Sequence, residues 1–489
     1  MERRAGNKKF LEVVEYGGVN PKKAERILSS PLARALFRSL LKEHRGETYY
    51  NQLWDAVIEG ERFQRVNSPF FYLLYFVIRI LYGLKGSKEL LKAKEGKIHE
   101  PYIKRGFKLM MESIARYGLT CPQIFSAPVI IVWNLTNACN LHCIHCYQDA
   151  RKRLRRELTT EEKKEVVDQM VEMGVPLLAF SGGEPLMAKD FYEIAEYAYS
   201  RGMRLFLASN GTLITRDVAR KIKEVGIKYV EISIDSVDPE KHDRFRGVEG
   251  YWGKAIEGIK NAVREGLSVG LASVITQLNY PEVEDLYRLS ADLGCGAFCY
   301  FNFIPTGRAK EIEEMDLDPY QREEVLRKLY RFLLEGKLTM VNTAPQYLRV
   351  CLESGGKAFP ISHYSSGRGE AAKILGRYIG GCGAGRAYLA IEPDGKITPC
   401  VFMKSLVVGD LRKERLKDIW EKSEVFKTLR DRSKLQLNCK MCRFRDYCGG
   451  CRARAYNYFG DITAPDPGCL YNIEYWNRLH KEEEVMKAM

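Results

Sequence analysis

The chain has 489 residues, of which 45% are hydrophobic, and a formal net charge of +14; two or three domains are expected at this length. Its 14 cysteines and a basic start with no apolar stretch behind it argue against a secreted, disulfide-stapled scaffold. They predict a cytoplasmic protein whose thiols bind metal. The positive charge suits nucleic acid, an anionic membrane or a heat-adapted surface dense in Lys, Arg and Glu. Because no RNA-binding motif is present, we expect no nucleic-acid partner.

The first predicted helix is basic and amphipathic. Ser30 and Pro31 are typical of an N-cap and a first helical residue. One face then carries Leu32, Leu36, Phe37, Leu40 and Leu41, and the other carries Arg34, Arg38 and Lys42. A helix of this kind suits a membrane surface, so the pattern predicts peripheral membrane contact.

A second apolar segment, residues 69–84, is rich in aromatic residues and is interrupted by Arg79. It is shorter than the roughly 20 residues that a membrane-spanning helix needs. Three interpretations stay open: an interfacial helix, one wall of an apolar substrate pocket, or a helix buried against the rest of the protein.

Three cysteines follow in the spacing Cys-x3-Cys-x2-Cys, at Cys139, Cys143 and Cys146. Three thiolates on one loop can hold three irons of a 4Fe–4S cubane and leave the fourth iron without a protein ligand. An iron with open positions can bind a substrate or cofactor. The alternative is a zinc knuckle that uses His142 or His145 as its fourth ligand.

Strands and helices alternate after these cysteines. An apolar run at 175–180 predicts a buried strand. The segment Ser181-Gly182-Gly183-Glu184-Pro185 follows it directly; its glycines allow close approach to a ligand, and its carboxylate suits a cationic amino group. Further strands are predicted at 204–210, 229–235, 269–275 and 297–304. This alternation argues for a parallel sheet with its site at the carboxyl ends of the strands.

A second group of cysteines fills the C-terminal part of the chain. Its members are Cys382, Cys400, Cys439, Cys442, Cys448, Cys451 and Cys469. Pairs spaced Cys-x2-Cys are also typical of a zinc ribbon, which makes a zinc-dependent nucleic-acid binder the non-enzymatic alternative. Seven cysteines exceed the four that one zinc ion needs.

The three-cysteine motif resembles the one that defines the radical S-adenosylmethionine (SAM) enzymes, and the second cysteine group resembles their SPASM extension. The resemblance implies an α/β fold with a partial (β/α)6 barrel and a catalytic 4Fe–4S cluster on Cys139, Cys143 and Cys146. The open iron would chelate SAM, and reductive cleavage of SAM would give a 5′-deoxyadenosyl radical. The implied cofactor-binding residues are Tyr147, Gly182, Gly183, Glu184, Asn210, Ser233, Asp235 and Arg246. Among them, Glu184 would meet the methionine ammonium group and Arg246 the carboxylate.

The same resemblance implies two auxiliary iron–sulfur clusters. Cys439, Cys442, Cys448 and Cys469 would hold one of them. Cys382, Cys400 and Cys451 would hold the other, and Cys351 is the nearest spare thiol in sequence for its fourth position. Two residues separate Cys448 from Cys451, whereas the typical family pattern has three.

These patterns divide the chain into five parts. Residues 1–126 form a helical N-terminal region that contacts substrate or membrane, and residues 127–310 form the barrel. Residues 311–375 form a helical linker, residues 376–475 the SPASM-type domain, and residues 476–489 a C-terminal helix.

The expected activity is abstraction of hydrogen from an unactivated carbon, followed by oxidation or by a new bond such as C–C. The auxiliary clusters would accept or relay an electron, and a ferredoxin or flavodoxin would supply the low-potential electron. The apolar, basic N-terminal region favours a hydrophobic substrate such as a membrane lipid chain. The segments Gly381-Cys382-Gly383-Ala384-Gly385 and Asp466-Pro467-Gly468-Cys469 resemble relatives that act on tetrapyrroles or mature peptides, and these are the alternatives.

Overall fold

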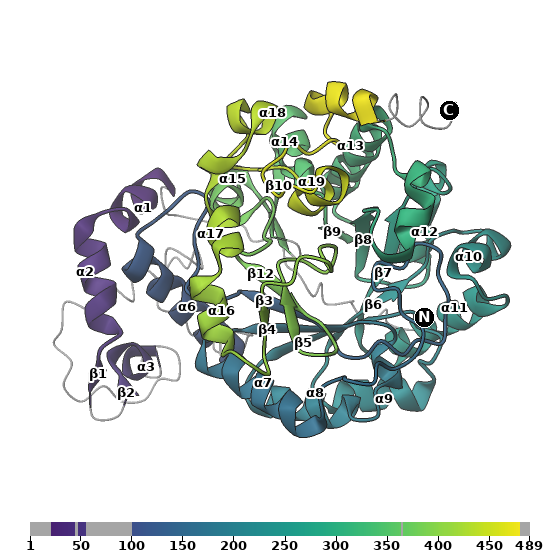
Figure 1. Ribbon diagram of the computed structural model, residues 1–489, viewed down its shortest axis with the longest axis horizontal. Coiled ribbons are helices and arrows are strands. Elements are labelled where there is room, and N and C mark those ends of the chain that lie inside the picture. The colour runs from purple at the N-terminus through teal and green to yellow at the C-terminus, as the bar shows by residue number, and fades with distance from the viewer. Residues whose placement is uncertain (1–20, 45–46, 55–99, 363–364, 480–489) are drawn as a thin grey trace, which may run out of the picture.

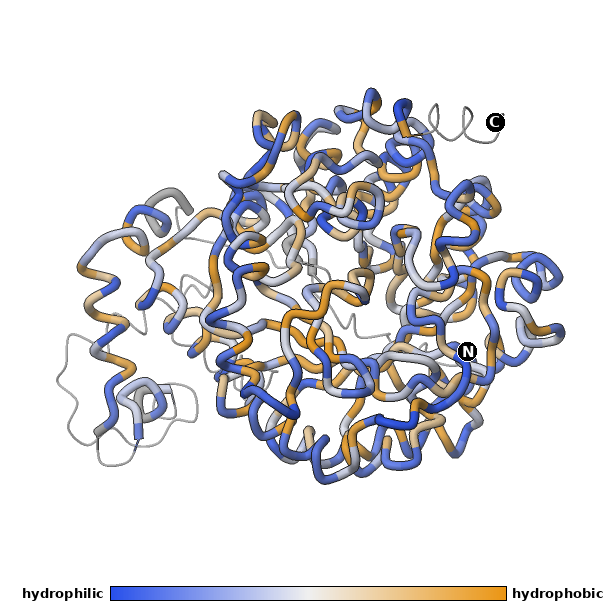
Figure 2. Tube along the Cα trace, in the orientation of Figure 1, coloured by the Kyte–Doolittle hydropathy of each residue, from blue (hydrophilic) through white to orange (hydrophobic). Residues whose placement is uncertain are grey.

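The computed structural model describes residues 21–44, 47–54, 100–362 and 365–479, which surround one large sheet (Figure 1). The sheet has ten strands in the order β14-β13-β12-β3-β4-β5-β6-β7-β8-β9. Hydrophobic residues follow its central strands in Figure 2, as expected for strands that are covered on both faces.

Six consecutive parallel strands form the barrel. They are β3 (Ile130–Asn134), β4 (Leu177–Ser181), β5 (Arg204–Ser209), β6 (Tyr229–Ser233), β7 (Ser268–Ile275) and β8 (Ala297–Asn302). The helices that connect them are α7 (Thr160–Glu172), α8 (Phe191–Ser200), α9 (Arg216–Glu224), α10 (Pro239–Arg246), α11 (Tyr251–Arg264) and α12 (Val283–Asp292), and they lie outside the sheet (Figure 1). The predicted partial (β/α)6 barrel is therefore confirmed, with β3 as a strand that the sequence did not single out.

Strands from later segments extend both edges of the barrel sheet. On one edge, β9 (Thr339–Asn342) runs parallel to β8. On the other, β12 (Tyr388–Ile391) runs parallel to β3, and β13 (Lys396–Thr398) and β14 (Gly409–Asp410) follow antiparallel. The segment 311–375, expected to be a helical linker, contains α13 (Pro319–Glu335) and α14 (Gln346–Glu353), but also β9, β10 (Ala358–Ser362) and β11 (Ser365–Arg368).

The N-terminal helices form a small separate core on one side of the barrel (Figure 1). They are α1 (Pro21–Leu28), α2 (Pro31–Leu40), α3 (Tyr49–Trp54) and α6 (Pro101–Tyr117). The predicted N-cap is confirmed, because the Ser30 side chain accepts a hydrogen bond from the Ala33 N–H. The apolar segment 69–84 lies outside the described residues. Within the described part, no helix combines the length and apolarity that a membrane span needs.

The C-terminal region packs directly on the barrel. It contains α15 (Gly369–Ile379), α16 (Leu416–Lys422), α17 (Glu424–Arg430), α18 (Leu437–Met441) and α19 (Arg452–Phe459). Residues 473–479 are helical, and the rest of the predicted C-terminal helix lies outside the described residues. Trp420 and Phe426 of this region share one hydrophobic cluster with Trp133 of β3 and Phe180 of β4, so the barrel and the C-terminal region have a common core.

Candidate active site

A loop that follows β3 carries the Cys-x3-Cys-x2-Cys motif into a cavity at the carboxyl ends of the strands. The cavity has a volume of about 440 Å³, and Cys139, Cys143 and Cys146 all line it. The loop closes on itself through hydrogen bonds from Cys139 N–H to Arg151 O (3.2 Å) and from Arg151 N–H to Asn137 O (3.0 Å). We call residues 135–151 the thiol loop.

The sulfurs of the thiol loop have the surroundings of cluster ligands. Leu141 N–H donates to Cys139 Sγ and Ala150 N–H to Cys146 Sγ, both at 3.4 Å, and such hydrogen bonds stabilise negative charge on cluster sulfurs. Burial raises the pKa of the Cys139 thiol to about 12, so its thiolate needs a bound cation such as iron. In the described ranges, no three His, Cys, Asp or Glu side chains converge on a single metal ion. A cubane requires no such convergence, because each thiolate binds a different iron.

Gly182 and Gly183 let the end of β4 lie against the backbone of the thiol loop. A Cβ on Gly182 would come within 2.6 Å of Thr136 O, and a Cβ on Gly183 within 2.2 Å of Ala138 O. Gly183 N–H donates to Thr136 O, and Glu184 N–H donates to Ala138 O, both at 2.8 Å. Both glycines line the cavity, so this packing also forms part of its wall.

Two predicted carboxylates lie behind the cavity wall. Glu184 is fully buried and accepts from Ser209 Oγ (2.9 Å), Asn210 N–H (2.8 Å) and Leu186 N–H (3.3 Å). Burial raises the pKa of Glu184 to about 7, opposed by these hydrogen bonds. Glu184 is absent from the lining, whereas Ser209 and Asn210 belong to it, so Glu184 contacts the cavity through its neighbours.

Asp235 has a similar place behind Arg246. Its Oδ2 lies 2.6 Å from Arg246 Nη2, and its Oδ1 accepts from Val274 N–H at 2.9 Å. Arg246 lines the cavity, its Nη1 lies 3.8 Å from Cys143 Sγ, and its buried Nε has no hydrogen-bond partner within the described structure. An unpartnered buried donor beside a thiol is suited to an anionic ligand group.

The remaining predicted cofactor residues also line the cavity. Ser233 is at the end of β6, and Asn210 Nδ2 donates to Asn140 Oδ1 of the thiol loop at 2.8 Å. Tyr147 OH donates to Asn134 Oδ1 (3.1 Å) and pairs with Ser181 Oγ (2.9 Å). The structure therefore gathers Tyr147, Asn210, Ser233 and Arg246 around the three thiols.

Sequence reasoning missed Glu231, which also lines the cavity. It lies on β6 between Tyr229 and Ser233, and Tyr229 OH donates to its Oε1 at 3.4 Å. Burial raises the pKa of Glu231 to about 7. The available signal was a charged residue inside an otherwise apolar strand, where carboxylates are rarely found unpaired.

The C-terminal cysteines fall into two groups. Cys382, Cys400 and Cys451 line the same cavity as the thiol loop. Cys439, Cys442, Cys448 and Cys469 line a separate pocket of about 20 Å³, where Cys442 Sγ accepts from Phe444 N–H (3.4 Å) and Cys448 Sγ from Gly450 N–H (3.3 Å). Cys351 is fully buried in the main hydrophobic cluster and lines neither space.

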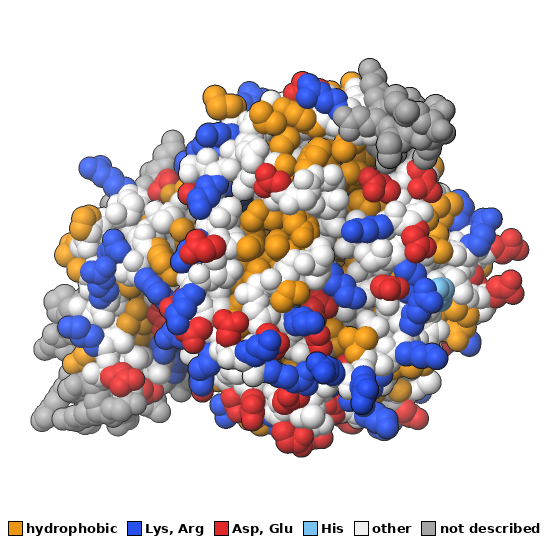
Figure 3. Space-filling model, in the orientation of Figure 1, with side chains coloured by type: hydrophobic (Ala, Val, Ile, Leu, Met, Phe, Trp, Pro, Cys, Tyr) orange, Lys and Arg blue, Asp and Glu red, His pale blue; other side chains and the backbone are white. Residues whose placement is uncertain are grey.

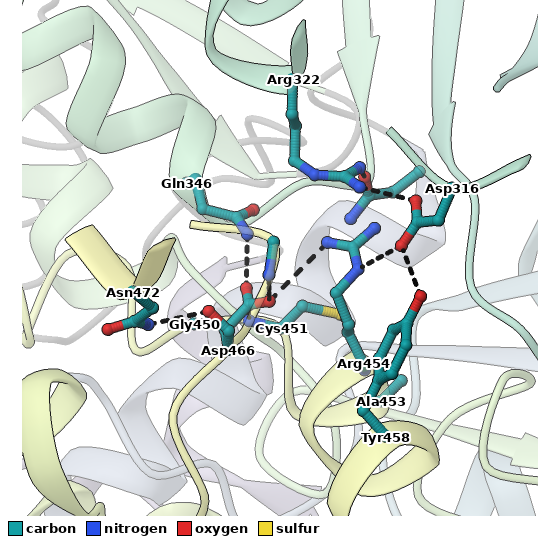
Figure 4. Close-up of polar contacts among 12 residues, drawn as sticks. Asp316, Arg322, Gln346, Gly450, Cys451, Ala453, Arg454, Tyr458, Asp466 and Asn472 are labelled. Carbon is teal, nitrogen blue, oxygen red and sulfur yellow. Dashed lines mark hydrogen bonds and ion pairs between the residues drawn. The ribbon is translucent and has the colours of Figure 1, made fainter. Parts of the chain in front are cut away.

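Asp466 contacts one cysteine of each C-terminal group, and Figure 4 shows it beside Cys451 and Arg454. Its carboxylate accepts from the backbone N–H of Cys451 at 2.7 Å and from the Gln346 side chain, while its own N–H donates to Cys439 Sγ at 3.5 Å. Arg454 Nη1 lies 3.7 Å from Asp466 Oδ1, and Arg454 Nε lies 3.2 Å from Asp316 Oδ2. This buried network joins the segment around α13 and α14 to the surroundings of both cysteine groups.

Comparison with known proteins identifies the family. Residues 133–290 match the radical SAM superfamily, and residues 382–443 match an iron–sulfur cluster-binding domain. The AdoMet-dependent heme synthase of Methanosarcina barkeri is 34% identical over 349 residues, covering 71% of this chain and 97% of the relative. The mycofactocin maturase MftC of Mycolicibacterium smegmatis is 30% identical over 366 residues, covering 74% and 86% respectively.

Solved structures show the same fold. SuiB of Streptococcus suis, solved with its precursor peptide SuiA, superposes with a TM-score of 0.61 over 90% of this chain and 92% of that one, at 16% identity. The chain belongs to the radical SAM superfamily and carries a C-terminal SPASM-type domain. It is an enzyme that uses SAM and a 4Fe–4S cluster, with auxiliary iron–sulfur clusters in the SPASM-type domain.

Proposed function

We propose that this enzyme oxidatively modifies a tetrapyrrole side chain by hydrogen abstraction. The observation that carries the proposal is the single cavity lined both by the thiol loop and by Cys382, Cys400 and Cys451. A substrate in this cavity lies between a site that generates a radical and a site that can accept an electron. The similarity to AdoMet-dependent heme synthase over 97% of that relative supports a tetrapyrrole as this substrate.

The cavity wall suits a large, flat, apolar ring system. Phe206, Phe301, Phe303, Phe402 and Tyr388 contribute aromatic side chains to it, and its volume of about 440 Å³ lies in the range of ligand pockets, roughly 300–1,000 Å³. Aromatic side chains pack well on extended π systems.

Each predicted site residue receives a role in this proposal. Cys139, Cys143 and Cys146 would hold the 4Fe–4S cluster, whose chemistry would be the reductive cleavage of SAM that supplies a hydrogen-abstracting radical. Arg246 binds the carboxylate of SAM and is oriented by Asp235. Glu184 acts on the methionine ammonium side of the site by fixing Ser209 and Asn210. Gly182 and Gly183 let the end of β4 pack against the thiol loop, and Tyr147, Asn210 and Ser233 complete the wall.

The auxiliary clusters, when bound, would accept the electron that the oxidation releases. We assign one cluster to Cys382, Cys400 and Cys451, and the other to Cys439, Cys442, Cys448 and Cys469, because the two sets line separate spaces. Abstraction of one hydrogen atom and loss of one electron together make a two-electron oxidation of the substrate. A low-potential ferredoxin or flavodoxin is the proposed source of the electron that starts each turnover.

A lipid substrate with peripheral membrane contact has less support. Arg34 Nε and Arg38 Nε each donate to Ala115 O at 3.1 Å, and Arg34 Nη2 donates to Arg116 O at 2.6 Å. These arginines therefore bind the carboxyl end of α6, and lipid head groups would have to compete for them. A peptide is the second candidate, favoured by the 30% identity to mycofactocin maturase.

The test is substrate-dependent turnover under anaerobic conditions. Reconstituted enzyme with SAM and dithionite is incubated with an iron porphyrin that carries propionate side chains, such as iron coproporphyrin III. We expect faster formation of 5′-deoxyadenosine and a change in the mass of the porphyrin, both lost in the Cys139→Ala variant. If the porphyrin stays unchanged and a ribosomal peptide precursor is modified instead, the tetrapyrrole assignment is wrong.

A further inference from the structure

A run of cations begins at Arg151, the last residue of the thiol loop. Five of the six residues at positions 151–156 are basic, namely Arg151, Lys152, Arg153, Arg155 and Arg156, and all six are exposed. None of the six is aromatic. We call residues 151–156 the basic run.

The basic run is fixed against the thiol loop. Arg151 exchanges backbone hydrogen bonds with Asn137 (3.0 Å) and Cys139 (3.2 Å). The buried carboxylate of Glu157, just beyond the run, accepts from Asn137 N–H (2.8 Å) and Leu154 N–H (3.0 Å). A protein that covers the basic run therefore comes directly beside the loop that carries the cluster thiols.

The charge of the basic run is only partly compensated. Arg151 Nε lies 3.8 Å from Asp149 Oδ1, and Arg153 Nε lies 3.1 Å from Glu157 Oε2. Among the described residues, Lys152, Arg155 and Arg156 form no ion pair with a carboxylate. On the face drawn in Figure 3, both Lys and Arg side chains and Asp and Glu side chains are visible at the surface. The run therefore has positive charge left over for a partner.

We propose that the basic run is the docking surface for the electron donor, a small acidic redox protein. The inference rests on the low-potential donor of the proposed function and adds where that donor binds. An acidic partner is attracted by the uncompensated cations, and attraction of this kind raises association rates and orients the encounter. A donor docked here would bring its redox centre beside the loop that carries the cluster thiols. Single-stranded nucleic acid fits less well, because its binding sites usually include aromatic side chains that stack on bases.

The test compares two ways of reducing the same enzyme. The triple variant Lys152→Glu, Arg155→Glu, Arg156→Glu is assayed for 5′-deoxyadenosine formation, first with reduced flavodoxin and its reductase and then with dithionite. At low ionic strength we expect the flavodoxin-driven rate to fall by at least about tenfold. The difference between the flavodoxin-driven rates of the parent and the variant should decrease as salt is added. The dithionite-driven rate should stay within about twofold of the parent, because a small reductant needs no docking surface.

A matched control reverses three exposed lysines elsewhere, Lys221→Glu, Lys260→Glu and Lys357→Glu, and should leave both rates unchanged. If the dithionite-driven rate also falls, the variant Lys152→Gln, Arg155→Gln, Arg156→Gln is assayed instead. The ratio of its flavodoxin-driven rate to its dithionite-driven rate is then compared with the same ratio for the parent. The proposal is overturned if the glutamate variant at low salt has the same flavodoxin-driven rate as the parent. It is also overturned if the lysine control loses as much of its flavodoxin-driven rate as that variant does. Loss of RNA binding with an unchanged flavodoxin-driven rate would assign the run to nucleic acid instead. SAM cleavage is measured without tetrapyrrole, so the outcome is independent of the substrate assignment.

Discussion

Gly183 is the residue of the site with the least space for a side chain. Its Cβ would lie 2.2 Å from Ala138 O, a backbone atom of the thiol loop that cannot rotate away. We predict that Gly183→Ala displaces the loop and removes the catalytic cluster, so that the reconstituted protein contains about four fewer irons per chain. Iron and sulfide analysis measures this loss, and the auxiliary clusters should remain.

Gly253→Ala is the control for Gly183→Ala, because Gly253 lies in α11 with nothing within 4 Å of a Cβ. It should retain the full iron content. Full iron and parental SAM cleavage in Gly183→Ala would show that the thiol loop tolerates the displacement.

Glu231 gives the stability of the cofactor-free protein a pH dependence with a defined sign. Burial raises its pKa from 4.5 to about 7, so between these values the folded chain keeps a proton that the unfolded chain has lost. The free energy of unfolding therefore falls as pH rises through this window, by about 3 kcal/mol. We predict that the free energy of unfolding of Glu231→Gln rises relative to that of the parent as the pH is raised from 5 to 8. Chemical denaturation at both values measures the difference, and the exposed Glu224→Gln should show none.

Among the helices, α2 binds the carboxyl end of α6 through two arginines. The last carbonyls of a helix lack intrahelical donors and carry partial negative charge, and Arg34 and Arg38 donate to Ala115 and Arg116. We predict that Arg34→Gln with Arg38→Gln destabilises the N-terminal helices by roughly 1 kcal/mol. The exposed Lys42→Gln should have no effect. Unchanged thermal stability together with loss of binding to anionic vesicles would favour the membrane interpretation instead.

The link between the two auxiliary sites depends on the segment just before Cys469. Asp466 accepts from Cys451 N–H and donates its own N–H to Cys439 Sγ, so its negative charge is close to both clusters. Removing a nearby negative charge stabilises the reduced form of a cluster. We predict that Asp466→Asn raises both auxiliary potentials, on the order of 50 mV, and leaves the catalytic cluster unchanged. A redox titration followed by electron paramagnetic resonance measures this, with Asp461→Asn as the control. A shift in one auxiliary cluster alone would contradict the shared position of Asp466.

Local signals in the sequence predicted most of the barrel, and long-range contacts account for what was missed. The apolar run of β5 predicts a buried strand without any information from the rest of the chain. In contrast, β12 pairs with β3 through contacts such as Leu389 with Ile131, across more than half of the chain, and no local pattern encodes that pairing. The same limit applies to the site. The spacing of the cysteines predicted which thiols gather, but the place of Glu184 behind Ser209 and Asn210 depends on how β4 and β5 align.

At the scale of the whole molecule, the SPASM-type domain is also part of the barrel sheet. Four residues of β12 pair with β3, from Tyr388 with Ile130 to Ile391 with Trp133, so removal of this region would expose a barrel edge. A chain that ends at residue 381 would present the backbone of β3 to solvent and uncover apolar residues of the common core, which favours edge-to-edge aggregation. We predict that this fragment is insoluble, whereas the full chain with Cys439→Ala and Cys442→Ala, which keeps every strand, stays soluble and loses one auxiliary cluster. Sedimentation after expression, with iron analysis of the soluble fraction, distinguishes the two. A soluble fragment 1–381 that still binds one 4Fe–4S cluster would show that the barrel closes without β12.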